Sequence, residues 1–133
     1  MDVADVVDTR KIVAIVEDDP QMAEFLSDML KYSGHWQCHY FADGQVAKEQ
    51  LPDLGAHLIL LDIGLPSLDG VSLYRMLRGY RSTRHIPIIV ITGSHGWQLQ
   101  RMGLRVGLFL HKPFKRQELL TMIRALLPDE ANI

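Results

Sequence analysis

Short apolar runs alternate along this chain with longer segments in which apolar residues recur at every third or fourth position. The run at 12–16 (IVAIV) has no polar alternation, which is typical of a strand covered by helices on both faces. Comparable strands are predicted at 36–41, 58–61, 86–91 and 108–111. Strands separated by helical segments indicate parallel pairing through crossover helices. The expected fold is therefore α/β, a doubly wound, five-stranded parallel sheet made of five βα units.

The segments between these strands carry helical signals. Pro20 suits the first turn of a helix, because its fixed backbone angle is helical and its missing N–H would have no partner there. Apolar residues then recur at spacings of three and four up to Leu30, and Gly34 is a suitable helix stop. Further helices are predicted at 44–51, 71–81 and 117–127.

The segment between Thr92 and Lys112 is expected to contain the fourth helix, but it is rich in glycine. Each glycine in a helix costs about 1 kcal/mol relative to alanine. The fourth helix is therefore predicted to be short or irregular. The glycines concerned are Gly93, Gly96, Gly103 and Gly107.

Composition supports one compact domain, because 47% of the 133 residues are apolar and can form a continuous core. The formal net charge of −2 would not attract nucleic acid or an anionic membrane, and neither partner is expected. A single cysteine excludes an internal disulfide, and no apolar run resembles an export signal or a membrane span, so we expect a cytoplasmic location. We place the domain at 11–128, with a flexible N-terminal arm at 1–10 and a C-terminal tail at 129–133.

Polar residues stand at the carboxyl ends of four of the predicted strands. Glu17 and Asp18 follow the first strand, Asp62 the third, Thr92 the fourth and Lys112 the fifth. In an open parallel sheet these ends lie at one edge, where ligands bind. The sequence therefore predicts that three carboxylates, one hydroxyl and one ammonium group converge on a single site.

Clustered carboxylates raise one another's pKa unless a cation lies among them. Mg²⁺ would remove this conflict, because it prefers oxygen ligands and commonly uses one or two carboxylates together with water and phosphate oxygens. Asp18 and Asp62 are the first candidates for direct ligands. Glu17 is expected to reach the ion through water, and the peptide carbonyl of Gly64 is a further candidate ligand.

An aspartate beside a divalent cation can act as a nucleophile toward phosphorus and form an acyl phosphate. Asp62 is the predicted phosphoacceptor, with Lys112 pairing with one phosphoryl oxygen and Thr92 donating its hydroxyl to another. Taken alone, an aspartate at a strand end is more often a turn residue or a helix cap. Matching polar groups at the ends of separate strands favour the functional interpretation.

Four segments of this chain stand out: VEDDP at 16–20, LDIGLPSLDG at 61–70, ITG at 91–93 and HKPF at 111–114. They closely resemble segments of the receiver domains of two-component response regulators, of the chemotaxis-regulator type, and the similarity extends over residues 11–127. The spacing of Asp62, Pro66, Asp69 and Gly70 is the most specific element of the resemblance.

This resemblance implies a flavodoxin-like receiver fold and a role in phosphorelay signal transduction. A sensor histidine kinase or a phosphotransfer protein would phosphorylate Asp62 in a Mg²⁺-dependent reaction, and the phosphoprotein would act on a downstream protein or an output domain. Such a domain is a signalling switch and not a classical enzyme, although it takes part in its own phosphorylation and dephosphorylation. By the same resemblance Thr92 and Phe109 occupy the switch positions, while a permanently buried core residue is an equally good interpretation of Phe109.

In this family the fourth helix, the fifth strand and the fifth helix form the surface that partners bind and through which a dimer can form. Here that surface departs from the family pattern, since Gly93 replaces the usual alanine, and Arg101 and Arg105 make the surface basic instead of acidic. Trp97 suits either a partner contact or a buried position. The sequence is consistent with a stand-alone receiver and with a part of a longer regulator.

Two other classes of protein deserve comparison. A flavodoxin-like cofactor protein would share the sheet but would need a phosphate-binding loop after the first strand, where Glu17, Asp18 and Asp19 would repel a phosphate. A phosphorylation-independent, pseudo-receiver-like interaction domain would keep the fold and the acidic residues but signal through partner binding alone. The unusual segment between Thr92 and Lys112 is the main support for this second alternative.

Overall fold

The computed structural model describes residues 10–33, 35–64, 69–93, 96–104 and 106–127. Five strands and five helices alternate along the described chain. The strands are β1 (Lys11–Val16), β2 (Trp36–Phe41), β3 (Leu58–Asp62), β4 (Ile88–Thr92) and β5 (Phe109–His111). The helices are α1 (Pro20–Ser33), α2 (Gly44–Leu54), α3 (Gly70–Gly79), α4 (Gly96–Arg101) and α5 (Arg116–Leu126).

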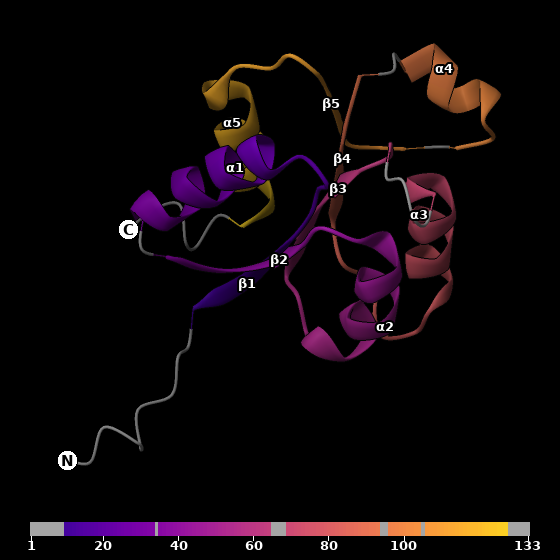
Figure 1. The fold of residues 1–133 in the computed structure, drawn as a ribbon, viewed down its shortest axis with the longest axis horizontal. Helices are drawn as coiled ribbons and strands as arrows, with labels where there is room; N and C mark the ends of the chain where they lie inside the picture. The colour runs from indigo at the N-terminus through magenta and orange to yellow at the C-terminus, as the bar shows by residue number, and fades with distance from the viewer. Residues whose placement is uncertain (1–9, 34, 65–68, 94–95, 105, 128–133) are drawn as a thin grey trace.

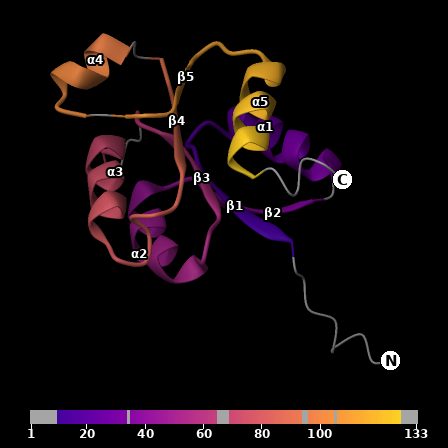
Figure 2. The same cartoon turned by 180° about the vertical axis from the view of Figure 1, so that it is seen from behind.

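The strands form one parallel sheet in the order β2-β1-β3-β4-β5. Helices α1 and α5 cover one face of this sheet, and α2, α3 and α4 lie on the other (Figure 1 and Figure 2). The predicted doubly wound α/β fold of five βα units is confirmed.

Side chains that alternate along the strands divide the apolar runs between two cores. In β1, Ala14 and Val16 pack in the core shared with α2 and α3, while Val13 and Ile15 pack in the core shared with α1 and α5. All four side chains are fully buried. This arrangement explains the lack of polar alternation, because a strand with both faces covered has no position that faces solvent.

Aspartates determine where three of the helices begin. Each accepts a hydrogen bond from the backbone N–H two residues later, at donor to acceptor distances between 2.7 and 3.0 Å. The three residues are Asp19, Asp43 and Asp69. Such bonds satisfy N–H groups of the first turn that have no partner within the helix. Pro20 is the first residue of α1, as predicted.

Several boundaries differ from the predicted ones. Helix α2 continues past residue 51 to Leu54, because Gly55 (φ +72) supplies the left-handed residue that ends it. Helix α3 ends at Gly79 instead of residue 81, since Tyr80 is extended and its N–H closes the last turn on Met76 O. Strand β4 begins at Ile88 instead of residue 86.

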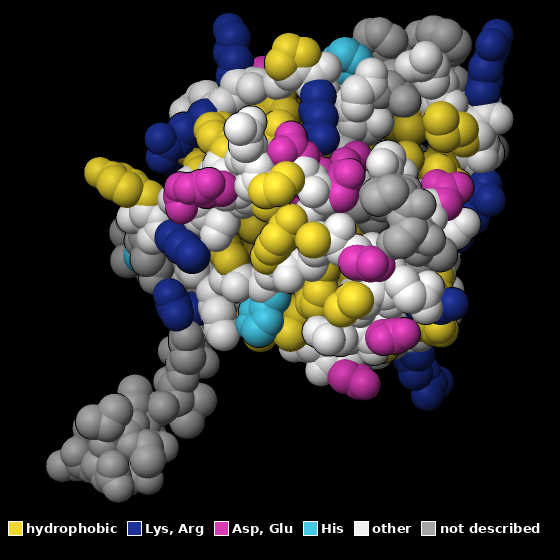
Figure 3. Space-filling view, in the orientation of Figure 1, with side chains coloured by type: hydrophobic (Ala, Val, Ile, Leu, Met, Phe, Trp, Pro, Cys, Tyr) yellow, Lys and Arg dark blue, Asp and Glu magenta, His cyan; other side chains and the backbone are white. Residues whose placement is uncertain are grey.

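Helix α4 has six residues, in agreement with the prediction of a short helix. Residues 1–9, 34, 66, 105 and 129–133 and the side chain of Trp97 lie outside the described residues, so the predictions for them stay predictions. No helix in the described part of the chain is long and apolar enough to cross a membrane. On the face shown in Figure 3, basic and acidic side chains are interspersed among apolar ones, in keeping with the nearly balanced charge.

Candidate functional site

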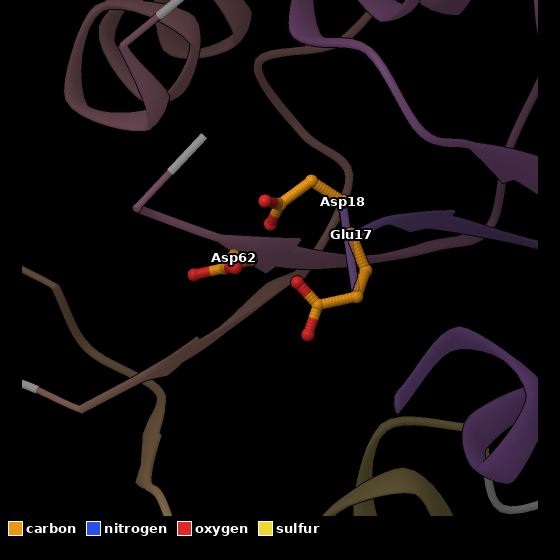
Figure 4. Close-up of side chains that lie close together, drawn as sticks. All are labelled: Glu17, Asp18 and Asp62. Carbon is orange, nitrogen blue, oxygen red and sulfur yellow. The ribbon is translucent and has the colours of Figure 1, made fainter. Parts of the chain in front are cut away.

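The sheet brings most of the predicted site residues together at the carboxyl ends of its strands. Glu17 and Asp18 follow β1, Asp62 ends β3, and Lys112 follows β5. Figure 4 shows the carboxylates of Glu17, Asp18 and Asp62 directed toward one another. One oxygen atom from each of these carboxylates lies within 4.8 Å of the others. Residues up to 95 positions apart in the chain thus form one cluster.

Strand pairing brings Glu17 next to Asp62. Val16 lies opposite Leu61 in the β1–β3 register, so the residues that follow them, Glu17 and Asp62, are neighbours. The N–H of Glu17 also donates to Phe41 O at 3.0 Å, which extends the pairing of β1 with β2. Asp19, the third consecutive acid, caps α1, and it is not part of the carboxylate cluster.

Lys112 bridges two of the carboxylates. Its Nζ lies 2.9 Å from Glu17 Oε1 and 3.6 Å from Asp62 Oδ2. The backbone N–H of Lys112 donates to Thr92 O at 2.7 Å, which holds the residue against the end of β4. The Lys112–Pro113 peptide bond is cis. The contacts with both carboxylates and the backbone hydrogen bond to Thr92 hold the ammonium group where it can pair with negative charge that develops at Asp62.

The carboxylates of Glu17 and Asp62 have opposite pKa shifts. Burial is the largest cause that raises the pKa of Glu17, to about 8, and the Asp62 carboxylate is the second cause. Burial alone would raise the pKa of Asp62, but interactions with Glu17, the Gly64 N–H and Lys112 outweigh it and lower that pKa. Burial alone would lower the pKa of Lys112, but both carboxylates raise it. The metal-free site therefore favours a proton on Glu17 over one on Asp62, and it favours a charged Lys112.

A divalent cation fits these residues. The side chain of Glu17 is 2% exposed, and its Oε2 is buried with no hydrogen-bond partner among the described residues. Such an atom is costly unless it has a ligand or a proton. Three carboxylates beside one ammonium group leave excess negative charge, and carboxylate oxygens are the ligands that Mg²⁺ prefers.

Thr92 and Phe109 occupy different surroundings. Thr92, 4% exposed, lines the pocket that contains Asp62. Phe109 is 38% exposed and lines a separate pocket with Leu99 and Leu104. The structure therefore brings Thr92 to the site but not Phe109, and the interpretation of Phe109 as a buried core residue does not hold in this structure.

The pocket beside Asp62 has a volume of about 530 Å³ and includes residues that sequence reasoning missed. Arg75, from α3, and Met102, which follows α4, line it together with Gly64. Neither was predicted, because no motif or spacing relates a single arginine on a helix to a strand end. Arg75 and Met102 lie at this pocket only because α3 packs beside β3 and α4.

Comparison with known proteins gives a consistent picture. A protein-family model described as the response regulator receiver domain matches residues 13–124. The transcriptional regulatory protein GltR of Pseudomonas aeruginosa is 35% identical over 117 residues, which cover 86% of this chain and 48% of GltR. The DNA-binding response regulator MtrA of Mycolicibacterium smegmatis is 32% identical over 120 residues, which cover 89% of this chain and 51% of MtrA. This chain thus spans about half the length of these curated relatives.

A similar solved structure is the receiver domain of the sensor histidine kinase PA1611 from Pseudomonas aeruginosa. It is 29% identical, with a TM-score of 0.81 over 90% of this chain and 99% of that one. That structure has a magnesium ion coordinated in the active site cleft.

Proposed function

The chain belongs to the response regulator receiver domain family, and we propose that its Asp62 accepts a phosphoryl group in a phosphorelay. The donor would be a sensor histidine kinase or a phosphotransfer protein. One observation carries this proposal. Asp62, 12% exposed, has Lys112 Nζ 3.6 Å from Oδ2 and the Gly64 N–H donating to Oδ1 at 2.9 Å. These contacts favour an ionised carboxylate, which is the form a nucleophile needs.

A bound Mg²⁺ is the second part of the proposal. Asp18 and Asp62 would hold the ion directly, Glu17 would reach it through water, and the carbonyl of Gly64 would be a further ligand. The support is the cluster of carboxylate oxygens within 4.8 Å and the unpartnered Oε2 of Glu17 among the described residues. When bound, the ion supplies positive charge that lets an anionic nucleophile approach an anionic phosphoryl group.

The remaining site residues would stabilise the phosphorylated state. Lys112 would pair with one phosphoryl oxygen, since its ammonium group already contacts Asp62. Thr92 would donate its hydroxyl to another, which would draw the end of β4 toward Asp62. Phe109 would then turn inward from its exposed position, and the surface formed by α4, β5 and α5 would change. This change would be the signal.

We further assign the receiver to residues 11–128, with an arm at 1–10 and a tail at 129–133, and place it in the cytoplasm. Its output would be a downstream protein or an output domain, bound through the surface of α4, β5 and α5, which would also be the dimer contact. The transcriptional and DNA-binding regulators among its relatives support such an output, because they are about twice as long as this chain.

Intact mass after incubation with acetyl phosphate and Mg²⁺ tests the phosphoacceptor. The native chain should gain the mass of one phosphoryl group only when Mg²⁺ is present, and Asp62→Asn should gain none. Asp53→Asn, an exposed aspartate on α2, is the matched control and should react like the native chain. Failure of the native chain to react with any donor would contradict the proposal.

The six-residue α4 favours a second candidate, a phosphorylation-independent interaction domain. The two functions differ in how they respond to beryllofluoride, which mimics the phosphoryl group. A receiver should show changed amide resonances around Thr92 and Phe109 when beryllofluoride and Mg²⁺ are added. An unchanged spectrum would favour the interaction domain.

A further inference from the structure

The pocket beside Asp62 contains a cation that the reaction described above does not use. Arg75 Nη2 donates a hydrogen bond to Met102 O at 2.8 Å, and this is its one hydrogen bond to the described residues. A guanidinium group has five N–H donors in a planar fork. The bond to Met102 therefore positions the group at the pocket and leaves other donors for a ligand.

Two glycines leave this pocket open beside Asp62. Among the described residues, a Cβ atom at Gly64 would meet only Asp62 Oδ1, at 3.6 Å, and a Cβ atom at Gly93 would meet nothing within 4 Å. Both glycines line the pocket of about 530 Å³. Neither glycine therefore adds a side chain that would fill the space beside the Asp62 carboxylate.

The charges that line the pocket suit an anion near Arg75. Arg75 is the one cationic side chain among the described lining residues. The two acids of the lining are already engaged, because Asp62 contacts Lys112 and Asp69 Oδ1 accepts the Val71 N–H at 2.9 Å. Besides the Thr92 hydroxyl, which is proposed to bind the phosphoryl group, Arg75 is therefore the cationic lining group among the described residues that offers donors to an incoming negative or partly negative oxygen.

We propose that Arg75 binds the acyl half of small acyl phosphates and so makes this receiver selective among small-molecule phosphodonors. This inference rests on the proposed role of Asp62 as phosphoacceptor. In the transfer, an Asp62 oxygen would form a bond to phosphorus while the bond between phosphorus and the acyl oxygen breaks. The carboxylate would leave with the bonding electron pair, and the Arg75 guanidinium would stabilise the negative charge that develops on it.

Two phosphodonors distinguish binding of the acyl group by Arg75 from a general effect of Arg75 on the reaction of Asp62. Acetyl phosphate releases acetate, whereas phosphoramidate releases ammonia and has no acyl group for Arg75 to bind. In Arg75→Gln the second-order rate constant for acetyl phosphate should fall about fivefold, the size expected of one exposed charge-assisted hydrogen bond. The rate constant for phosphoramidate should not change. Arg75→Lys keeps the charge and should retain most of the acetyl phosphate rate.

Arg81→Gln is the matched control, because Arg81 is exposed just after α3 and lines a different pocket. It should leave both rate constants unchanged. An equal fall of both rate constants in Arg75→Gln would overturn the inference, since Arg75 would then act on Asp62 or on the fold. The inference would also be overturned if neither rate constant changed. If neither acetyl phosphate nor phosphoramidate modified Asp62 in the native chain, the proposed function would fail, and this inference with it.

Discussion

One side of the site, at the ends of β1 and β3, is held more firmly than the other side, which α4 and β5 form. Glu17 and Asp62 extend β1 and β3, two adjacent strands of the sheet whose apolar side chains are nearly all fully buried, and Lys112 contacts both carboxylates. The other side consists of α4, with six residues, and β5, with three. Its described anchors include the buried Leu99, Leu104 and Leu110, the pairing of β5 with β4, and the hydrogen bond from Arg75 to Met102.

If the proposed function holds, this contrast separates the part of the molecule that carries the chemistry from the part that responds to it. A phosphoacceptor site needs charged groups that are already in place before the reaction. A signalling surface needs a segment of low local stability, and short elements with few buried contacts are the ones that open first. A change at Asp62 should therefore alter α4 and β5 at a smaller cost in free energy than a movement of β1 or β3.

Equivalent truncations on the two sides should have unequal costs. Leu60 in β3 and Leu99 in α4 are both buried leucines. We expect Leu60→Ala to lower the free energy of unfolding by about 4 kcal/mol and Leu99→Ala by about 2 kcal/mol, because a short helix can relax around the cavity. Urea unfolding of both variants measures the difference, and equal losses would show that the two sides are equally rigid.

Gly70 tests the rigid side at the loop that follows Asp62. A Cβ atom there would lie 2.4 Å from both Cα and O of Ile63, and the Gly70 N–H donates to Ile63 O at 3.1 Å. Gly70→Ala should destabilise the protein by about 3 kcal/mol through this overlap. Gly79→Ala is the control, because a Cβ atom at Gly79 meets nothing within 4 Å. A stable Gly70→Ala variant would mean that Ile63 and Gly70 can move apart.

Stability without metal should depend on pH through Glu17. Folding raises the pKa of this residue from 4.5 to about 8, so it favours the protonated form. The resulting stabilisation is present in full below about pH 4.5 and is lost as the pH rises through about 8.

In EDTA, the free energy of unfolding should therefore fall between pH 5.5 and 8.5 by at least about 1.4 kcal/mol, the value of one pKa unit. Added Mg²⁺ should restore the stability at the higher pH, because it replaces the lost proton. Glu17→Gln cannot ionise and is the control for thermal or urea unfolding. A fall of the same size in that variant would assign the pH dependence to another group.

The smallest effect is expected at the end of α4. Gly103 has a φ of +78°, and a Cβ atom there would lie 3.0 Å from Arg75 Nη2. Gly103→Ala should cost about 1 kcal/mol for the left-handed backbone and increase hydrogen exchange in α4. Gly107→Ala, with no positive φ and open space around its Cβ, should leave exchange unchanged. Faster exchange in β1 as well would contradict the separation of the two sides.

Much of the fold could be predicted because it depends on local patterns. Unbroken apolar runs such as 12–16 indicate strands covered on both faces, and Pro20 marked the start of α1 correctly. The ends of helices were predicted less well. Whether α2 continues beyond Pro52 depends on Gly55, and whether α3 stops at Gly79 depends on the backbone of Tyr80, which no periodicity describes.

By itself the sequence determined that charged strand ends meet, because parallel strands place their carboxyl ends at one edge of a sheet. It did not determine that Asp19 turns away to cap α1, that Phe109 is exposed, or that Arg75 lies in the pocket of Asp62. It also could not show that burial raises the pKa of Glu17. These properties depend on burial and on distances between residues far apart in the chain, and only the packing of helices against the sheet decides them.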